Sequence, residues 1–414
     1  MSVSPSYTPI RIEPPETRVH ALDALRAFVL LLGVTYHTVR RHGVQENLGD
    51  ATSWLLGWFV TYTHCFRLPV FFLLSGFFAC AMIQRRGMVA FLHDRARRIL
   101  LVLVVAAFLI YLLKPICKAL LLLGAVKMGL IHLPPNLAGM SPWEMAALLL
   151  QRDAWPHLTH LWFLYYLLLV TSLFLLVRWL MLAPGSARVQ RAASSGFHRA
   201  ISSGLAPVWA TLLVLPLLSL MQGYGLDTPN MGLVVHYPVL IIYTFFFAIG
   251  WWLRRQPDLL AVLARRWKAL LLLSVAMSVM AWNCQWLYEI GEDTSTRKWA
   301  CALASGLTTN LGVFGWIGLF VALLARPSPV ARYLSDSSYW VYLAHLPLIH
   351  ALQVGLHGWD SVWIKLLVIN AVSFAILLSS YQWCVRYTWV GGWLNGRRRI
   401  RREVASPVAV AAIR

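Results

Sequence analysis

Long apolar runs, separated by short charged or Pro/Gly-rich breaks, dominate the chain. A run of about 20 apolar residues is long enough to form a helix that crosses the hydrocarbon core of a membrane. Such runs lie near residues 21–40, 53–83, 99–123, 158–182, 205–221, 238–253, 269–288, 299–325, 338–357 and 361–390. The second run is long enough for a tilted span or for a break at Pro69. The pattern therefore predicts an all-α, polytopic membrane helix bundle with about ten transmembrane helices.

Composition excludes an ordinary soluble globular protein. Of the 414 residues, 59% are hydrophobic and only 13% are charged. Such a chain has too few charged residues to cover a water-exposed surface of its size. The first twenty residues lack the basic start and the small-residue cleavage site of a secretory signal. We therefore expect the first apolar run to be an uncleaved membrane anchor.

The formal net charge of +20 is placed where it predicts topology rather than nucleic-acid binding. Basic residues cluster at 85–98, 188–199, 254–268 and 397–402, which fall on one side of the membrane if ten spans alternate. The positive-inside rule puts that side in the cytoplasm, together with both termini. The predicted organisation is a cytoplasmic segment over 1–20, a membrane domain over 21–392 and a basic cytoplasmic tail over 393–414.

Two ionisable residues, Arg26 and His37, lie inside the first predicted span. They are eleven positions apart, which is about 16 Å along a helix and about half of a ~30 Å hydrocarbon core. Eleven residues are also close to three helical turns, so both side chains point to nearly the same side. Ionisable groups inside a span cost a few kcal/mol, and their default interpretation is functional.

Carboxylates are absent from the middle of every predicted span, and Asp23 and Asp336 lie at the cytoplasmic edges of two of them. Cation-coupled carriers usually keep such a carboxylate as the ion relay, so this class is disfavoured. A general base within the membrane would have to be histidine. The six cysteines are scattered without a CxxC pair, and no metal site is predicted.

Four further histidines lie within predicted spans, and one of them, His350, receives only a structural interpretation. His160, in LTHLWFL, lies at a level comparable to His37, and His345, in VYLAHLPL, is predicted about a third of the way up from the cytoplasm. His64 lies near the middle of the second span, one turn before Arg67. A single intramembrane histidine is often only an interhelical hydrogen-bonding residue. That structural interpretation stays open for His64.

Several motifs, in order along almost the whole chain, resemble those of the acyltransferase 3 family of integral-membrane acyltransferases. LDALRAFVLLLGVTYHT resembles the Arg-x10-His signature of the first span, and FRLPVFFLLSGFFA resembles the FF-x-x-SG motif of the second. DRARRI, HLWFL and SDSSYWVYLAHLPL are similar to later motifs. Within the family, CFRLPVFFLLSGFF, HLWFL and YLAHLPL together resemble the glucans biosynthesis protein C group.

This resemblance implies a transmembrane O-acyltransferase in the bacterial inner membrane. It implies transfer of a succinyl group from cytosolic succinyl-CoA, a co-substrate rather than a bound cofactor, to hydroxyls of an osmoregulated periplasmic glucan. The expected partners are acyl-CoA, the glucan, the lipid bilayer and other glucan-biosynthesis proteins, without nucleic acid. Two alternatives stay open: acetyl transfer to another envelope polysaccharide, and a glycan carrier or flippase that catalyses no reaction. A sensor or scaffold with a degenerate active site is the least favoured.

His37 is the predicted base, because a sugar hydroxyl must lose its proton as it attacks the thioester. The predicted catalytic set joins His37 and Arg26 with His160 and His345, which either orient His37, contact acceptor hydroxyls or hold the donor. Fixed cations are needed for the phosphates of CoA. The predicted donor-binding set is Arg26, Arg95, Arg97, Arg98 and Asp23, the last orienting Arg26; a pure topology signal is the alternative for the arginine cluster.

The predicted acyl pocket contains Arg67, Ser75 and His64. Arg67 would pair with the free carboxylate of a succinyl group, since a carboxylate in a low-dielectric cavity needs a cation. The alternative for Arg67 is a bracing contact with backbone carbonyls. Ser75 and Gly76 also allow two helices to pack closely.

Overall fold

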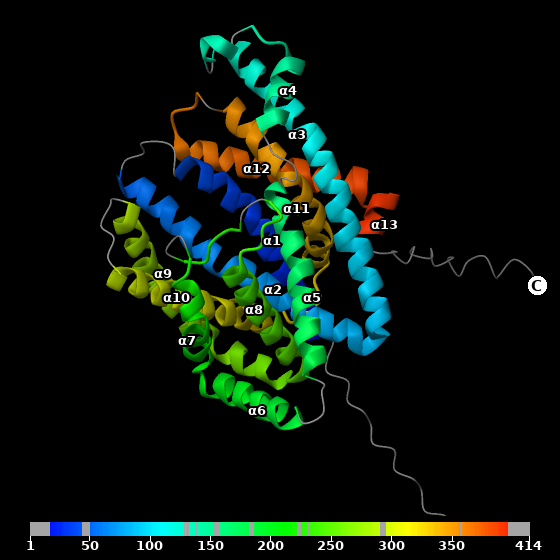
Figure 1. Cartoon of the computed structure of the whole chain (residues 1–414), viewed down its shortest axis with the longest axis vertical. Coiled ribbons are helices and arrows are strands. Elements are labelled where there is room, and N and C mark those ends of the chain that lie inside the picture. The colour runs from blue at the N-terminus through cyan, green and yellow to red at the C-terminus, as the bar shows by residue number, and fades with distance from the viewer. Residues whose placement is uncertain are drawn as a thin grey trace, which may run out of the picture.

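A computed structural model describes residues 17–43, 50–127, 129, 132–137, 139–152, 158–181, 186–221, 225–229, 232–289, 295–356 and 358–395, and over these residues it contains helices and no strand (Figure 1). The α-helices are α1 (Thr17–Gly43), α2 (Asp50–Arg95), α3 (Leu101–Lys127), α4 (Pro142–Arg152), α5 (Trp162–Leu180), α6 (Ala187–Ser203), α7 (Ala206–Leu218), α8 (Tyr237–Arg255), α9 (Asp258–Glu289), α10 (Ser295–Leu323), α11 (Pro329–Gly355), α12 (Val362–Ser380) and α13 (Trp389–Asn395). A π-helical turn, η1 (Ala96–Leu100), joins α2 to α3, a 3-10 turn, η3 (Thr159–Leu161), precedes α5, and η4 (Tyr381–Val385) follows α12.

Six stretches of the described chain are long and apolar enough to cross a membrane: His20–Arg40, Ala51–Lys127, Thr159–Leu180, Tyr237–Arg255, Thr296–Leu323 and Val362–Val385. The second stretch, of 77 residues, contains two of the predicted runs. The remaining runs coincide with α7, α9 and α11. The protein is thus a helical membrane protein, while the number of about ten spans stays a prediction. Residues 1–16 and 396–414 lie outside the described residues, so the placement of both termini is untested.

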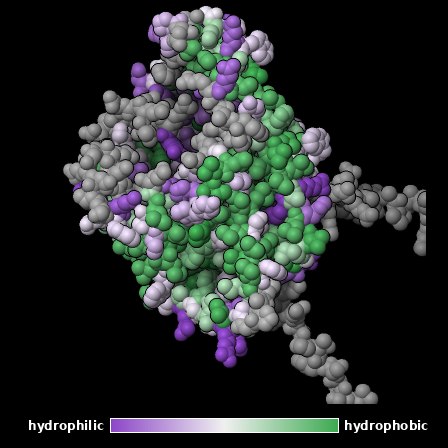
Figure 2. All heavy atoms as spheres, in the orientation of Figure 1, coloured by the Kyte–Doolittle hydropathy of each residue, from purple (hydrophilic) through white to green (hydrophobic). Residues whose placement is uncertain are grey.

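The outer surface of the bundle is apolar. Figure 2 shows hydrophobic residues over most of the middle of one face, with hydrophilic residues gathered toward its edges. On α3, the side chains of Val104 and Phe108 are 57% and 55% exposed. Exposed apolar surface of this extent would be unstable in water and is expected where lipid chains cover the protein.

Helix α2 is interrupted at Gly87, just after the second apolar run, and not at Pro69. Pro69 lies inside α2, where the helix continues through it, whereas Gly87 has φ 80° and ψ 171°. This conformation is strained for any residue with a Cβ and accessible to glycine. Of the two predicted alternatives, a tilted span or a break at Pro69, the break does not occur. A proline inside a membrane helix is tolerated when neighbouring groups satisfy the freed carbonyl. The break at Gly87 sets a short basic segment apart from the long apolar part of α2.

Helices α2 and α8 cross at two glycines. A Cβ at Gly76 would overlap the carbonyl oxygen of Phe247, and a Cβ at Gly250 would overlap that of Leu73. The close packing expected for Gly76 is therefore confirmed. Small residues at such a crossing let two backbones approach, which is how membrane helices gain van der Waals contact.

Helix α6 was not predicted, because its segment has too few apolar residues to resemble a span. In Figure 1 it lies across the end of the bundle beside α7, and its Phe197 ring lies 5.9 Å from that of Trp252. Its Arg188, Arg191 and Arg199 are exposed. An amphipathic helix with this distribution is typical of the membrane interface.

Helix α4 was also not predicted, although its sequence carries a start signal. The Ser141 N–H donates to the Glu144 carboxylate at 2.7 Å, and the Glu144 N–H donates to the Ser141 hydroxyl at 3.3 Å. These reciprocal bonds form a capping box and lower the pKa of the Glu144 carboxyl. The helix packs against α3 through Met145.

Candidate active site

A cavity of about 600 Å³ lies between α1, α2, α5 and α11, at the end of the bundle that carries the arginine clusters. We call this end the basic end and the cavity the arginine cavity. Five arginines line it, together with three aspartates: Arg26, Arg85, Arg86, Arg95, Arg98, Asp23, Asp94 and Asp336. The excess of cations makes the cavity suited to an anionic ligand.

The arginine cavity reaches deep into the bundle. Arg85 and Phe71 both line it and are fourteen positions apart in the helix, which corresponds to about 21 Å along the axis of α2. At its inner end, the Phe163 ring makes edge contacts with the rings of Phe71, at 4.6 Å, and Tyr342, at 5.7 Å. Ser75 also lines the cavity, and its hydroxyl donates to the Phe71 carbonyl at 2.9 Å.

Arg26 lies in the wall of this cavity and joins α1 to α11. Its guanidinium lies 3.2 Å from the Asp23 carboxylate, so the expected ion pair is present. It also donates to the Ser335 hydroxyl at 3.2 Å and lies 5.2 Å from the centre of the Phe78 ring. These contacts hold Arg26 in place, while its predicted role toward a donor stays a prediction.

The arginines of the DRARR segment point into two different spaces. Arg95 and Arg98 line the arginine cavity, whereas Arg97 lines a neighbouring one. Arg98 forms a 3.1 Å ion pair with Asp94, and its carbonyl accepts a 2.6 Å hydrogen bond from Tyr339. The buried Nε of Arg95 has no hydrogen-bond partner among the described residues.

Beyond the inner end of the cavity, three predicted residues form one cluster. The centre of the His345 ring lies 5.2 Å from the centre of the His37 ring and 5.3 Å from that of the His160 ring. Tyr342 connects this cluster to the cavity, because its ring lines the cavity and its hydroxyl donates to the His160 carbonyl at 2.8 Å. We call His37, His160 and His345 the histidine cluster.

His345 lies at the level of His37, whereas the sequence predicted a lower position. It was placed about a third of the way across, on the assumption that its span begins near residue 338. Helix α11 instead begins at Pro329, where Ser328 caps it. The longer helix brings His345 to the level of His37, and both His37 and Arg26 face α11, as expected from their spacing.

Hydrogen bonds set the proton positions on two of the histidines. A carbonyl oxygen can only accept, so the Nδ1–H of His345 donates to the Tyr342 carbonyl at 2.7 Å and leaves Nε2 unprotonated in the neutral ring. That Nε2 is buried and has no partner among the described residues. His160 likewise donates from Nε2 to the Leu343 carbonyl at 3.2 Å.

The residue before His160 is held in an unusual backbone conformation. Thr159 has φ 47°, in the left-handed region that a β-branched residue rarely adopts. Its hydroxyl lies 3.3 Å from Nδ1 of His160. Strained backbone of this kind persists where surrounding contacts hold a functional group. The His37 ring, in contrast, is half-buried and receives no hydrogen bond from the described residues, so its nitrogens are available to a ligand.

Arg67 and His64 both pack against the Tyr36 ring, and neither lines the arginine cavity. The Arg67 guanidinium lies 4.5 Å from the centre of the Tyr36 ring, and Gly33 leaves room for it, since a Cβ there would meet Nη1. The Nε of Arg67 is buried without a partner in the described part of the chain. His64 accepts from the Tyr36 hydroxyl at 3.4 Å and donates to the Leu226 carbonyl at 2.8 Å. The predicted acyl-pocket residues therefore do not share one space.

Several residues of the site were not selected from the sequence. Tyr342 lies one turn before His345, and this spacing was a signal that was not used. Asn395 of α13 lines the arginine cavity and donates to the Asp336 carbonyl at 2.8 Å. It was assigned to the cytoplasmic tail because no apolar run marks α13. No group of three or more His, Cys, Asp or Glu that could hold a metal occurs in the residues that the structure describes.

Comparison with known proteins assigns the chain to a family. The acyltransferase 3 family model, described as an acyltransferase domain, matches residues 19–382. Glucans biosynthesis protein C of Salmonella paratyphi B is 24% identical over 355 residues, which cover 81% of this chain and 83% of that protein. Glucans biosynthesis protein C of Salmonella schwarzengrund is 25% identical over 356 residues, with the same coverage. No solved structure matches the chain. The helical membrane architecture and the match over most of the chain lead to one conclusion: this protein belongs to the acyltransferase 3 family of membrane acyltransferases.

Proposed function

We propose that the protein is a transmembrane O-acyltransferase that moves a succinyl group from cytosolic succinyl-CoA to hydroxyls of a periplasmic glucan. The observation that carries this proposal is the arginine cavity, which runs from the basic end of the bundle to Tyr342, in contact with the histidine cluster. The positive-inside rule orients the basic end toward the cytoplasm, with about ten spans and both termini on that side. A glucan acceptor is supported by the names of the similar Salmonella proteins.

The arrangement is suited to acyl transfer across a membrane. The phosphates of CoA would pair with arginines near the basic end, and the arm carrying the thioester would extend past Ser75 toward Tyr342. A sugar hydroxyl approaching from the opposite end would lose its proton to His37 while its oxygen attacks the thioester carbon. The new C–O bond forms as the C–S bond breaks, and the leaving thiolate takes up the proton from His37, which returns to its neutral form. The unprotonated Nε2 of His345 would accept a hydrogen bond from protonated His37.

Analysis of the glucan tests this function as a whole. Osmoregulated glucans are isolated from the native bacterium with and without the gene for this protein, and their ester substituents are identified by mass spectrometry. We expect succinyl esters to disappear in the deletion strain and to return with the intact gene. Loss of acetyl esters alone would assign a different acyl group. If the purified protein turned over no thioester but moved glucan across vesicles, the chain would be a carrier.

The donor side makes a separate prediction. Replacing Arg26 with alanine is expected to raise the KM for succinyl-CoA about 10-fold, because a charge-assisted contact with the donor is lost from ground state and transition state alike. Steady-state kinetics of the purified protein measure this change. Arg199→Ala is the matched control, since Arg199 is exposed on α6, away from the cavity, and bonds only to a carbonyl of its own helix. An unchanged KM combined with inverted membrane orientation would make Arg26 a topology signal.

Arg67 tests the acyl specificity. If its unpaired guanidinium binds the distal carboxylate of the succinyl group, Arg67→Met should lower succinyl transfer about 10- to 100-fold more than acetyl transfer, because methionine keeps the apolar bulk and removes the charge. Rates with succinyl-CoA and acetyl-CoA on the same acceptor give the ratio. An equal fall for both donors, together with lower thermal stability, would show that Arg67 supports the packing around Tyr36 instead.

A further inference from the structure

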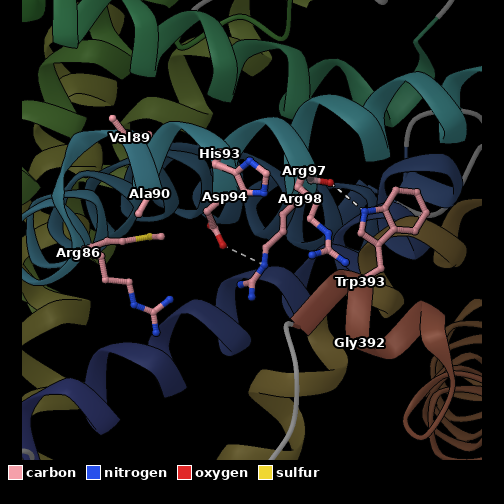
Figure 3. Close-up of a pocket in the computed structure, with 10 residues that line it drawn as sticks. Arg86, Val89, Ala90, His93, Asp94, Arg97, Arg98, Gly392 and Trp393 are labelled. Atoms are coloured by element: carbon pink, nitrogen blue, oxygen red, sulfur yellow. Dashed lines mark hydrogen bonds and ion pairs between the residues drawn. The ribbon is translucent and has the colours of Figure 1, made fainter.

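A second cavity lies beside the arginine cavity and is built partly by α13. It has a volume of about 630 Å³, within the range of about 300–1,000 Å³ that is usual for small-molecule sites. Figure 3 shows Arg86 at one end of it and Trp393 at the other, with His93, Asp94, Arg98 and Arg97 between them. Because Trp393 distinguishes it, we call this space the Trp393 cavity.

The two cavities share a wall. Met82, Arg86, Asp94 and Arg98 line both of them. Helix α13 also contributes to both, with Gly392 and Trp393 in one and Leu394 and Asn395 in the other. A single elongated ligand can therefore occupy both spaces, with its middle part at Arg86 and Arg98.

The charge of the Trp393 cavity favours phosphate. Asp94 is the only carboxylate among its lining residues, and the 3.1 Å ion pair with Arg98 engages it. Arg86 and Arg97 have no carboxylate partner among the described residues. Arg86 and Arg97 therefore supply positive charge and hydrogen-bond donors, and Arg98 in the shared wall adds a third guanidinium. A phosphorylated ligand needs this combination.

The indole of Trp393 is fixed in orientation. Its Nε1–H donates to the Arg97 carbonyl at 2.9 Å, and its ring stacks on Trp389 with a centroid distance of 6.1 Å and an interplanar angle of 18°. The hydrogen bond ties this aromatic ring to the arginine segment itself (Figure 3). A fixed aromatic ring beside a cluster of arginines is the combination that binds a heterocyclic base next to its phosphates.

We infer that the Trp393 cavity binds the nucleotide end of the acyl-CoA donor, with the adenine against Trp393 and its phosphates at Arg86 and Arg97. The pantetheine arm then passes the shared wall at Arg98 and enters the arginine cavity. This inference rests on the proposed donor and makes α13 the element that selects CoA over a shorter thioester. A lipid phosphate would meet the same arginines, but it would make no use of the tryptophan ring.

Binding measurements on the purified full chain in detergent test this assignment without requiring acyl transfer. The probes are CoA, adenosine 3′,5′-bisphosphate and pantetheine, which lacks the nucleotide. Trp393→Ala is expected to weaken the binding of CoA and of adenosine 3′,5′-bisphosphate by about 5- to 100-fold, the usual effect of removing one base-stacking aromatic. The affinity for pantetheine is expected to stay unchanged, and Trp393→Phe to restore much of the CoA affinity. Trp383→Ala is the control, because Trp383 is 80% exposed and lies in neither cavity wall.

Three outcomes would overturn the inference. Equal CoA affinity in Trp393→Ala and the original protein would exclude stacking on this residue. Equal losses for CoA and pantetheine would show that Trp393 only supports α13. If Arg97→Ala abolished the binding of phosphatidylglycerol and left the affinity for CoA unchanged, the arginines would bind lipid instead. If CoA binds through Trp393 while no glucan ester forms, the inference holds and the proposed acceptor fails.

Discussion

Replacing His37 with alanine is expected to lower acyl transfer by about 10²-fold or more, within the range that general acid–base catalysis supplies. The expectation follows from the surroundings of the ring. His37 is half-buried and has no hydrogen bond to the described residues. Its ring centre lies 5.2 Å from that of His345, whose buried Nε2 has no partner in the described part of the chain. No other described histidine combines contact with this cluster and nitrogens that are open to a ligand. Initial rates of ester formation with saturating succinyl-CoA measure the loss.

Two comparisons make the His37 result specific. His20→Ala changes an exposed histidine on the same helix. The rate of acyl transfer by this variant should stay within about twofold of that of the original protein. His345→Ala removes only the group that supports His37, so a smaller loss is expected. Adding His345→Ala to His37→Ala should lower the rate little further, because residues that act as a unit are not additive. Near-normal transfer by a well-inserted His37→Ala protein would remove His37 from the mechanism.

Replacing Gly76 with alanine is expected to destabilise the protein by at least about 1–3 kcal/mol, the usual cost of overpacking. The added Cβ would overlap the backbone carbonyl of Phe247, which cannot move away as a flexible side chain can. Gly250→Ala should behave alike, because it meets the Leu73 carbonyl at the same crossing. Thermal unfolding in detergent, followed by monomer content, measures the change.

Gly124→Ala provides the matched control for Gly76. Gly124 also lies inside a helix, α3, but no neighbouring atom lies within 4 Å of an added Cβ. Alanine there is expected to be neutral or stabilising, since glycine is the poorer helix former by about 1 kcal/mol. Glycine to alanine should thus lower the stability at Gly76 and leave it unchanged or raise it at Gly124. A Gly76→Ala protein as stable as Gly124→Ala would show that α2 and α8 can separate without loss.

The sequence by itself determined the features that depend on local pattern. Runs of apolar residues at membrane length predicted the helices, because a backbone in lipid must satisfy its own hydrogen bonds. The spacing of Arg26 and His37 predicted that they share one side of α1, since helical period alone decides this, and both do face α11. The ordered motifs predicted the family, which the match over residues 19–382 confirms.

Only the tertiary structure decided which distant residues meet. Arg26 bonds to Ser335, 309 positions along the chain, and no local pattern indicates such a pairing. His345 joins His37 because α11 begins earlier than its apolar run, and the polar first turns of that helix are stabilised by packing and by the Ser328 cap. Asn395 and Trp393 enter the cavity walls because a short helix without an apolar run folds back onto α11 and η1. Contacts of this kind depend on how whole helices pack, and helix packing combines weak interactions from many residues.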